Sequence, residues 1–251
     1  MIDLTGKRAV VTGGSRGIGG ATSRLLAQCG AHVALSYRSR VAEAEAMVAS
    51  LTALGVQSLA QPAELSDRAS VDSFFSRVER EWGGVDIFVG NAGIWPVEEI
   101  PADAMSDARW HRTMTENIDG MFFSTRAALR LMGAGGRVVL VSSTAGQRGE
   151  SMHADYAASK GAMISFVKSV AVEVGPRQIT CNSVAPGWVD TEMCEEAFAG
   201  EGRARIAAGI PVGRIATPDD IAAPIVFLCS RQARHITGEI LNVNGGSVLC
   251  G

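Results

Sequence analysis

The chain has 251 residues, of which 47% are hydrophobic, so it is long enough to bury a sizeable core as one α/β domain or as two smaller ones. Its formal net charge is −3 and it has no long run of basic residues, although 20 of its 23 basic residues are arginine. This balance argues against a nucleic-acid-binding surface and gives no support to an acidic macromolecular partner.

The first residues lack the basic region and apolar stretch of a signal peptide, and no later apolar run reaches the ~20 residues that a membrane-spanning helix needs. We therefore expect a cytoplasmic protein. The cysteines and histidines show no metal-ligand spacing, so no metal site is expected and the cysteines are interpreted as core or surface residues. These residues are Cys29, Cys181, Cys194, Cys229 and Cys250, and His32, His111, His153 and His235.

Short apolar runs alternate with longer segments of helical periodicity, which is typical of a parallel sheet covered by helices on both faces. The predicted strands are Arg8–Val11, Val33–Ser36, Gln57–Ala60, Asp86–Val89, Arg137–Val141, Ile179–Ser183 and Ile240–Val243. The predicted helices are Gly17–Cys29, Ala42–Leu54, Ser70–Glu81, Ala108–Met132, Asp155–Val174 and Pro218–Cys229. No linker interrupts the alternation, so we expect one domain over residues 1–251. The stretch Asp190–Arg214 is predicted to be a helical excursion that covers a cleft.

The first predicted strand runs directly into a glycine-rich segment, residues 12–19, within which a helix begins. Glycines at such a point allow a tight turn and let backbone N–H groups at the helix N-terminus approach a pyrophosphate. The segment therefore predicts a dinucleotide site. Its contacts are assigned to Gly13, Ser15, Arg16, Gly17, Ile18 and Gly19.

The spacing T-G-x-x-x-G-x-G resembles the short-chain dehydrogenase/reductase family, and further motifs of that family follow in order along nearly the whole chain. They are Asn91-Ala92-Gly93, Pro186-Gly187 with Val189 and Thr191, and the closing segments Ile236–Glu239 and Asn244–Gly246. The resemblance implies a doubly wound Rossmann fold with seven parallel strands in the order 3-2-1-4-5-6-7. It also implies that the first of these motifs closes over the adenine-ribose side of a cofactor, and that the second meets the nicotinamide carboxamide.

Cofactor choice is set where the second strand ends, because the adenosine ribose of such a cofactor lies there. Family members that prefer NAD have an acid at this point, whereas this chain has Tyr37 followed by Arg38, and Arg16 is a second cation nearby. With no competing carboxylate, the two arginines predict a site for the 2′-phosphate of NADP(H); two solvated arginines in an arginine-rich chain are the alternative. The pair that caps the adenine in the family corresponds here to Glu64-Leu65, which departs from the usual Asp-Val.

Tyr156 and Lys160 are four residues apart in a segment with helical periodicity, so they share one helix face. The chain has only two tyrosines and three lysines, which makes this spacing rare by chance and predicts general acid–base chemistry by Tyr156. Lowering a phenol pKa from ~10 to ~7 requires roughly 4 kcal/mol. A lysine ammonium ~5 Å away supplies about 3 kcal/mol at an effective dielectric of ~20. Lysine alone is therefore marginal, and we expect the positive nicotinamide of an oxidised cofactor to supply the rest.

Ser143 lies 13 residues before Tyr156, the spacing at which the family has its catalytic serine. Ser142 is the alternative, and because side chains alternate across a strand only one of the two should face the site. We expect the Ser143 hydroxyl to hydrogen-bond the substrate oxygen. Asn117 matches the family's helix asparagine, which implies that it anchors a water connecting Lys160 to solvent; a solvent-facing asparagine is the alternative.

Four large side chains near these motifs are predicted to line a pocket for an apolar ketone or alcohol of moderate size, with ordinary core packing as the alternative for each. They are Trp95, Met152, Trp188 and Met193.

The chain looks most like the 3-oxoacyl-(acyl-carrier-protein) reductase branch, whose partner presents an acidic helix. That branch has a basic stretch before its fifth strand, where this chain has Leu131–Gly136, although Arg130, Arg137 and Arg177 lie nearby. We therefore favour a general carbonyl reductase or secondary-alcohol dehydrogenase, with the acyl-carrier reductase as the alternative. A dinucleotide-sensing regulator without catalysis is a more remote alternative, because Tyr156 and its partners are present.

The apolar faces of the segments 108–132 and 155–174 are wider than a helix covering one sheet face needs. Family members commonly pair these two helices across a subunit interface, often as tetramers. A homo-oligomer, tetrameric or dimeric, is therefore expected.

Overall fold

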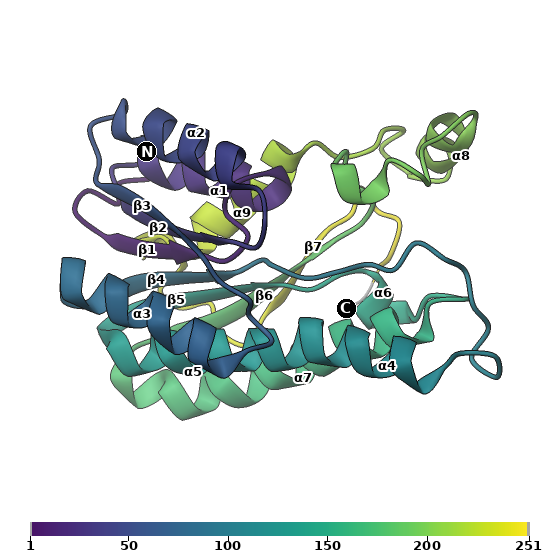
Figure 1. Cartoon of the computed structure of the whole chain (residues 1–251). Coiled ribbons are helices and arrows are strands. Elements are labelled where there is room, and N and C mark those ends of the chain that lie inside the picture. Colours follow the sequence, from purple (N-terminus) through teal and green to yellow (C-terminus); the bar gives the residue numbers. More distant parts are fainter. Residues whose placement is uncertain (1, 250–251) are drawn as a thin grey trace.

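The computed structural model describes residues 2–249. Within this part of the chain, seven parallel strands form one sheet in the order β3-β2-β1-β4-β5-β6-β7 (Figure 1). The strands are β1 (Arg8–Val11), β2 (His32–Tyr37), β3 (Ser58–Pro62), β4 (Val85–Gly90), β5 (Met132–Val141), β6 (Thr180–Pro186) and β7 (Ile240–Val243). The order reverses where β1 pairs with β4, and in such sheets ligands bind beyond the carboxyl ends of the strands at this point. The predicted Rossmann fold is confirmed, and every predicted strand overlaps an observed one.

The start of β5 was predicted wrongly. The strand begins at Met132, well before the expected Arg137, because Met132 pairs with Val85 ahead of a register shift in β4. Glycines fill most of the intervening positions, and Gly135 has a φ of +82°. Without side chains these positions give no apolar alternation, so the pattern could not reveal them.

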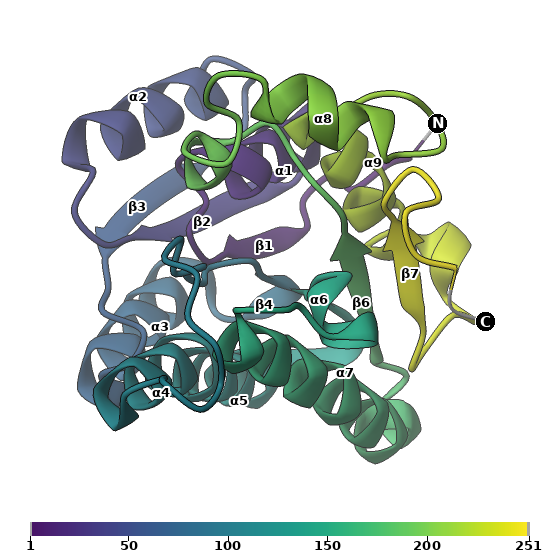
Figure 2. The same ribbon diagram turned by 90° about the vertical axis from the view of Figure 1, so that its right-hand side faces the viewer.

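Helices cover both faces of the sheet (Figures 1 and 2). One layer contains α1 (Gly17–Gln28), α2 (Val41–Thr52) and α9 (Pro218–Leu228); the other contains α3 (Arg68–Trp82), α5 (Gly120–Leu131) and α7 (Ala154–Val174). The side chains of β1 alternate between the two cores, since Ala9 and Val11 lie under the first layer and Val10 under the second. Burial on both faces explains why the strands read as continuous apolar runs.

The ends of two helices follow directly from local chemistry. Asp67 accepts a hydrogen bond from the backbone N–H of Ala69 at 3.0 Å at the start of α3, and Gly83, with a φ of +73°, ends that helix in the left-handed conformation. At the start of α9, Thr217 and Asp220 form a reciprocal capping box.

The predicted helix Ala108–Met132 is confirmed as one continuous helical run, with an irregular turn inside it. It consists of α4 (Asp107–Met114), a π-helical turn η1 (Thr115–Asp119) and α5. Asn117 lies in this turn and is only 1% exposed. Its Oδ1 accepts the backbone N–H of Ile94 at 2.8 Å and its Nδ2 donates to the carbonyl of the same residue at 3.0 Å. A π turn inserts one residue without breaking the apolar pattern, so the sequence predicts the helix but not this turn.

The excursion predicted at 190–214 contains only two short helical segments, η3 (Glu192–Cys194) and α8 (Gly202–Ala208). Phe198, Ile210 and Ile215 form a small apolar cluster of their own, against which Trp188 packs. α8 lies on the right of Figure 1, at the same end of the molecule as α6 (Ala145–Arg148), which follows β5. The excursion therefore stands beside the carboxyl ends of the strands.

Two further short helices are η2 (Gly175–Arg177) and η4 (Arg231–Ala233). Among residues 2–249, no helix is long and apolar enough to cross a membrane. Cys29, Cys181, Cys194 and Cys229 are free thiols, whereas Cys250 lies outside the described residues.

Candidate active site

A cleft of about 710 Å³ opens where the carboxyl ends of the strands meet. Residues at or just after the ends of β1 to β6 line it: Gly13, Tyr37, Ala63, Asn91, Ser142 and Gly187. Because parallel strands point the same way, residues far apart in the sequence meet at this edge. Most predicted site residues line the cleft: Gly13, Ser15, Arg16, Gly17, Ile18, Tyr37, Arg38, Glu64, Leu65, Asn91, Ala92, Gly93, Trp95, Ser143, Tyr156, Lys160, Pro186, Gly187, Trp188, Val189, Thr191 and Met193.

The glycine-rich loop has the shape of a phosphate cradle. Gly13 (φ +63°) and Gly17 (φ +53°) adopt the left-handed conformation that other residues rarely take. A Cβ on Gly19 would lie 2.2 Å from the carbonyl oxygen of Gly13, so this glycine allows the loop to close on itself rather than lining the cleft. Asn91 braces the loop, with its Nδ2 donating to the carbonyls of Thr12 at 3.1 Å and Gly13 at 3.3 Å. The loop and the N-terminus of α1 therefore fit a dinucleotide pyrophosphate.

The arginines at the cofactor end are paired with carboxylates. Arg38 donates to Glu116 at 3.1 Å, and Arg16 and Arg40 both pair with Glu192. The premise that no carboxylate competes for the arginines is therefore wrong. Glu116 comes from η1 and Glu192 from η3, so only the folded chain brings them here. All three arginine side chains are about half exposed, so these pairs contribute little energy and a phosphate can replace the carboxylates.

Glu64, the acid expected near the adenine, is held locally. Its carboxylate accepts the Ser66 hydroxyl at 2.8 Å and the Ser66 backbone N–H at 3.4 Å. Leu65 packs against the start of α5, where a Cβ on Gly120 would lie 3.1 Å from the leucine Cβ. Both residues reach the cleft, but the Glu64 carboxylate is already engaged with Ser66.

Tyr156 and Lys160 lie in the first turns of α7 and reach the floor of the cleft. Lys160 is 4% exposed, its Nζ donates to the carbonyl of Val141 at 2.9 Å, and that atom lies 5.8 Å from the centre of the Tyr156 ring. One glycine makes room for the lysine backbone, since a Cβ on Gly146 would lie 2.5 Å from the carbonyl carbon of Lys160. Gly146 is a packing requirement that the sequence analysis missed.

Burial controls the ionisation of both side chains. It raises the pKa of Tyr156 to about 12, and the hydrogen bond with Ser143 opposes that rise only in part. It lowers the pKa of Lys160 to about 8, because the ammonium is removed from water. The expectation that Lys160 alone lowers the phenol pKa most of the way is thus not met in the free protein.

The two neighbouring serines have separate environments. Ser142 is 3% exposed and its hydroxyl donates to the carbonyl of Lys160 at 3.0 Å, so it fastens β5 to α7. Ser143 has its hydroxyl at Tyr156, where it also accepts the backbone N–H of Ala145 at 3.2 Å. The structure therefore brings Ser143, rather than Ser142, to the phenol.

Known proteins resemble this chain over almost its whole length. A family model described as enoyl-(acyl carrier protein) reductase matches residues 13–247. The chain is 38% identical over 247 residues to 3-oxoacyl-(acyl-carrier-protein) reductase of Escherichia coli, covering 98% of each protein. It is 37% identical over 250 residues to L-rhamnose 1-dehydrogenase (NAD(P)(+)) of Sphingomonas sp., covering 97% of this chain and 96% of the relative. The chain belongs to the short-chain dehydrogenase/reductase family.

A solved structure of the same family has the same fold as this chain. A short-chain dehydrogenase from Burkholderia cenocepacia, in complex with NADP, superposes with a TM-score of 0.91 at 37% identity and covers 97% of this chain and 98% of its own. The chain is thus an oxidoreductase of the short-chain dehydrogenase/reductase family.

The family's helix asparagine, Asn117, does not reach the cleft with its side chain. Besides the two bonds to Ile94, its Nδ2 donates to the Ser159 hydroxyl at 3.0 Å. The solvent-facing alternative is wrong because the residue is buried. Both amide hydrogens are therefore used, and the side chain fastens the segment after β4 to α7.

At the substrate end, three of the four predicted wall residues line the cleft. Trp95 and Trp188 meet edge to face with ring centres 5.7 Å apart, and Met193 lies at the same end. Met152 is 42% exposed and is not among the described residues that line the cleft, so its prediction as a wall was wrong. Its backbone has a φ of +65°, a local turn that the sequence does not reveal, and its carbonyl accepts the N–H of Ile100 at 3.0 Å.

The sequence analysis also missed an ion pair at this end. Arg148 and Glu150 both line the cleft, with an Arg148 nitrogen 3.2 Å from a carboxylate oxygen of Glu150. The negative charge of Glu150 is one of the smaller causes of the raised pKa of Tyr156, after burial.

Proposed function

We propose that this chain, as one domain over residues 1–251, is an NADP(H)-dependent oxidoreductase that interconverts a ketone and a secondary alcohol. One observation carries the proposal: a phenol, a buried ammonium and a hydroxyl meet on the floor of a cleft whose other end is a phosphate cradle. The three groups belong to Tyr156, Lys160 and Ser143. The excursion at about 190–214 covers the substrate end of the cleft.

A bound nicotinamide cofactor supplies the hydride for reduction and accepts it in oxidation. In reduction, Tyr156 donates its phenolic proton to the substrate oxygen, while Ser143 donates a hydrogen bond to the same oxygen. Lys160 stabilises the phenolate that remains and holds the nicotinamide ribose. In oxidation, Tyr156 acts as the base, so its pKa has to fall from about 12, and we infer that the fall accompanies cofactor binding.

NADP(H), rather than NAD(H), is the proposed cofactor. Arg16, Arg38 and Arg40 surround the position where family members that prefer NAD have an acid, which is Tyr37 in this chain. We propose that the 2′-phosphate takes over the arginines from Glu116 and Glu192, because a phosphate forms stronger charge-assisted hydrogen bonds. The NADP complex of the Burkholderia relative supports this assignment.

An apolar ketone or alcohol of moderate size is the proposed substrate, held between Trp95 and Trp188. Reduction of a 3-oxoacyl group on an acyl carrier protein is the second candidate, favoured by the similarity to the Escherichia coli reductase. The uncharged segment 133–136 weighs against it, since an acidic carrier helix needs cations at its docking surface.

We further propose a homo-oligomer, a tetramer or dimer, formed through α5 and α7, which lie side by side in Figures 1 and 2. Aromatic rings cluster on these helices: the ring centres of Phe122 and Phe166 are 6.3 Å apart, and Phe122 is 39% exposed. The guanidinium of Arg126 lies 4.8 Å from the centre of the Phe122 ring. Such a patch fits a symmetric contact between two copies.

The test is oxidation of NADPH in the presence of 2-butanone, acetophenone and acetoacetyl-N-acetylcysteamine, with the wild type and Tyr156→Phe. We expect the wild type to reduce at least one ketone, and the variant to lose turnover by about two to four orders of magnitude while still binding NADPH. Reduction of the thioester alone would select the acyl-carrier candidate. Wild-type inactivity on all three probes, or normal turnover by the variant, would overturn the proposal.

A further inference from the structure

A buried ion pair lies beside the site without belonging to the chemistry described above. Asp155, the residue before Tyr156, is fully buried, and the Arg109 side chain is 11% exposed. Arg109 Nε donates to the Asp155 carboxylate at 2.8 Å, and the Thr113 hydroxyl donates to it at 2.7 Å. Burial by itself would raise the pKa of Asp155, but these hydrogen bonds outweigh it and hold the pKa below its usual value, so the pair is ionised.

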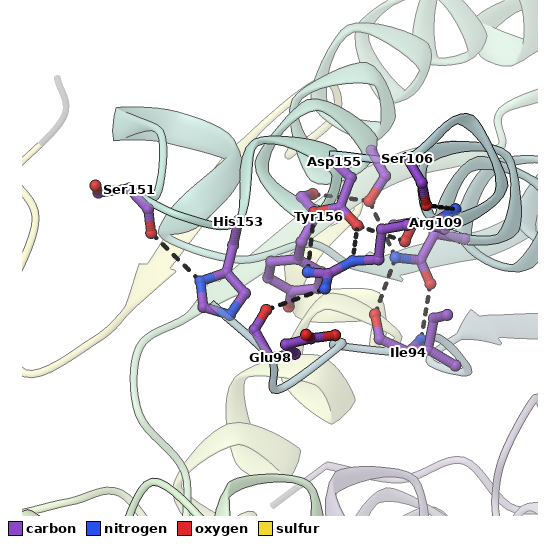
Figure 3. A network of polar contacts seen from close by, with 11 residues as sticks. Ile94, Glu98, Ser106, Arg109, Ser151, His153, Asp155 and Tyr156 are labelled. Carbon is purple, nitrogen blue, oxygen red and sulfur yellow. Dashed lines mark hydrogen bonds and ion pairs between the residues drawn. The ribbon is translucent and has the colours of Figure 1, made fainter. Parts of the chain in front are cut away.

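The same guanidinium of Arg109 also holds the segment of residues 91–100, which forms a wall of the cleft. Arg109 Nη1 donates to the backbone carbonyl of Glu98 at 3.0 Å, so one side chain spans from α7 to the segment after β4 (Figure 3). That segment, residues 91–100, has no helix or strand, and it carries Trp95, Pro96 and Val97 into the cleft.

Two further contacts fasten this wall to the start of α7. The Trp95 ring stacks on His153 with ring centres 5.2 Å apart and an interplanar angle of 28°. The Ile100 N–H donates to the carbonyl of Met152 at 3.0 Å. At its other end the wall is held by Asn117, which binds both backbone groups of Ile94. The wall and the first turn of α7 thus form one body, with Arg109 as their only charged link among the described contacts.

We propose that Arg109 is a positioning residue that fixes the wall carrying Trp95 against the first turn of α7, and so sets the size of substrate that reaches Tyr156. The part about substrate size rests on the proposed function; the mechanical link does not. Arginine suits this task because its planar fork donates in several fixed directions at once, to Asp155 and to Glu98, which a lysine ammonium on a flexible stem does not reproduce.

The experiment compares Arg109→Lys with the wild type, using Arg68→Lys as the matched control, because Arg68 pairs with Asp72 on the exposed surface of α3. Hydrogen exchange is measured in the free protein. We expect peptides covering residues 94–100 and 152–156 to exchange about tenfold faster in Arg109→Lys, with peptides from β1 and α1 unchanged. The control should match the wild type throughout.

The second readout is the ratio of kcat/KM for acetophenone to that for 2-butanone. We expect Arg109→Lys to lower this ratio at least about fivefold, because the larger ketone needs the Trp95 wall, while the Kd for NADPH stays within about twofold. Unchanged exchange at 94–100 would overturn the mechanical link, whatever the activity. Faster exchange with an unchanged ratio would overturn the role in selectivity. If the wild type reduces no ketone, the proposed function and the selectivity role fail, while the exchange result still decides the link.

Thr113 offers a milder variant in case Arg109→Lys does not fold. Thr113→Val removes one hydrogen bond to Asp155 without changing the side-chain shape, and Thr113→Ser keeps that bond. We expect Thr113→Val to raise exchange at 94–100 by about threefold and Thr113→Ser to restore the wild-type rate. Equal exchange in the two variants would contradict the proposal.

Discussion

The buried ammonium of Lys160 should make the protein less stable than a variant that lacks this charge. Lys160→Met keeps a long, unbranched side chain and removes the ammonium. Lowering the lysine pKa from 10.5 to about 8 corresponds to roughly 3 kcal/mol of unfavourable charging in the folded state at neutral pH. Loss of the bond from Nζ to the Val141 carbonyl costs about 1 kcal/mol. The variant should therefore be about 2 kcal/mol more stable at pH 7, while losing its turnover.

The extra stability of Lys160→Met should decrease as the pH rises. Below pH about 8 the lysine is protonated in both the folded and the unfolded chain, so the full charging cost is present. As the pH rises from about 8 to 10.5, the folded chain releases its proton first and the cost disappears. The stability advantage of Lys160→Met should accordingly be complete at pH 7. Above pH 10.5 only the lost hydrogen bond to Val141 remains, so the variant should then be about 1 kcal/mol less stable than the wild type.

Chemical unfolding of the two proteins at pH 7, 8, 9 and 10 measures this difference, and other titrating groups cancel because both chains share them. At pH 7 the melting temperature of the variant should be roughly 4–8 °C higher. A variant that is no more stable than the wild type at pH 7 would refute the reasoning. So would an advantage that does not shrink towards pH 10.

Four further substitutions test the two ends of the cleft. Ser143→Ala should reduce turnover by about 10²–10³-fold, whereas Ser142→Ala, which loses the bond to the Lys160 carbonyl, should cost about 1 kcal/mol of stability and leave turnover within a few-fold; the reverse pattern in steady-state kinetics and thermal unfolding would exchange the two roles. Arg38→Asp should raise the KM for NADPH far more than that for NADH, and an equal effect on both would contradict the NADP(H) assignment. Glu192→Gln should lower the KM for NADPH several-fold with little change for NADH, because it frees Arg16 and Arg40; an unchanged KM would show that Glu192 does not compete with the phosphate.

The fold was accessible from the sequence because its elements carry local signals. Each strand is a short apolar run, and the glycine-rich loop marks the point where β1 turns into α1. The structure departs from the prediction at two places, the glycines before Arg137 and the π turn around Asn117. Glycine has no side chain, so the residues before Arg137 cannot show the alternation that marks a strand. Around Asn117 the apolar pattern of the helix continues unchanged, so it does not reveal the π turn.

The contents of the site were predictable to a lesser degree. Motif spacing located Tyr156, Lys160 and Ser143, because one strand end and one helix turn fix their separation. The partners of the charged groups were missed, since contacts such as Arg16 with Glu192 join residues 176 positions apart. The expected effect of lysine on the phenol pKa was wrong for a related reason, because burial, which the sequence does not show, is the largest cause of the pKa shift of each group.

The ionisation state of Tyr156 in the free protein suits one of the two proton transfers in the proposed reaction. A phenol with a pKa of about 12 holds its proton at every physiological pH, so Tyr156 is ready to act as an acid towards a ketone. The opposite direction needs a phenolate, and the surrounding protein, with Glu150 among its negative charges, disfavours one. Oxidation therefore depends on a charge that arrives with the cofactor, whereas reduction needs no such help for its proton. If the proposed roles hold, the reductive rate should be nearly independent of the ionisation of Tyr156 and should follow that of Lys160, falling as the pH rises above about 8.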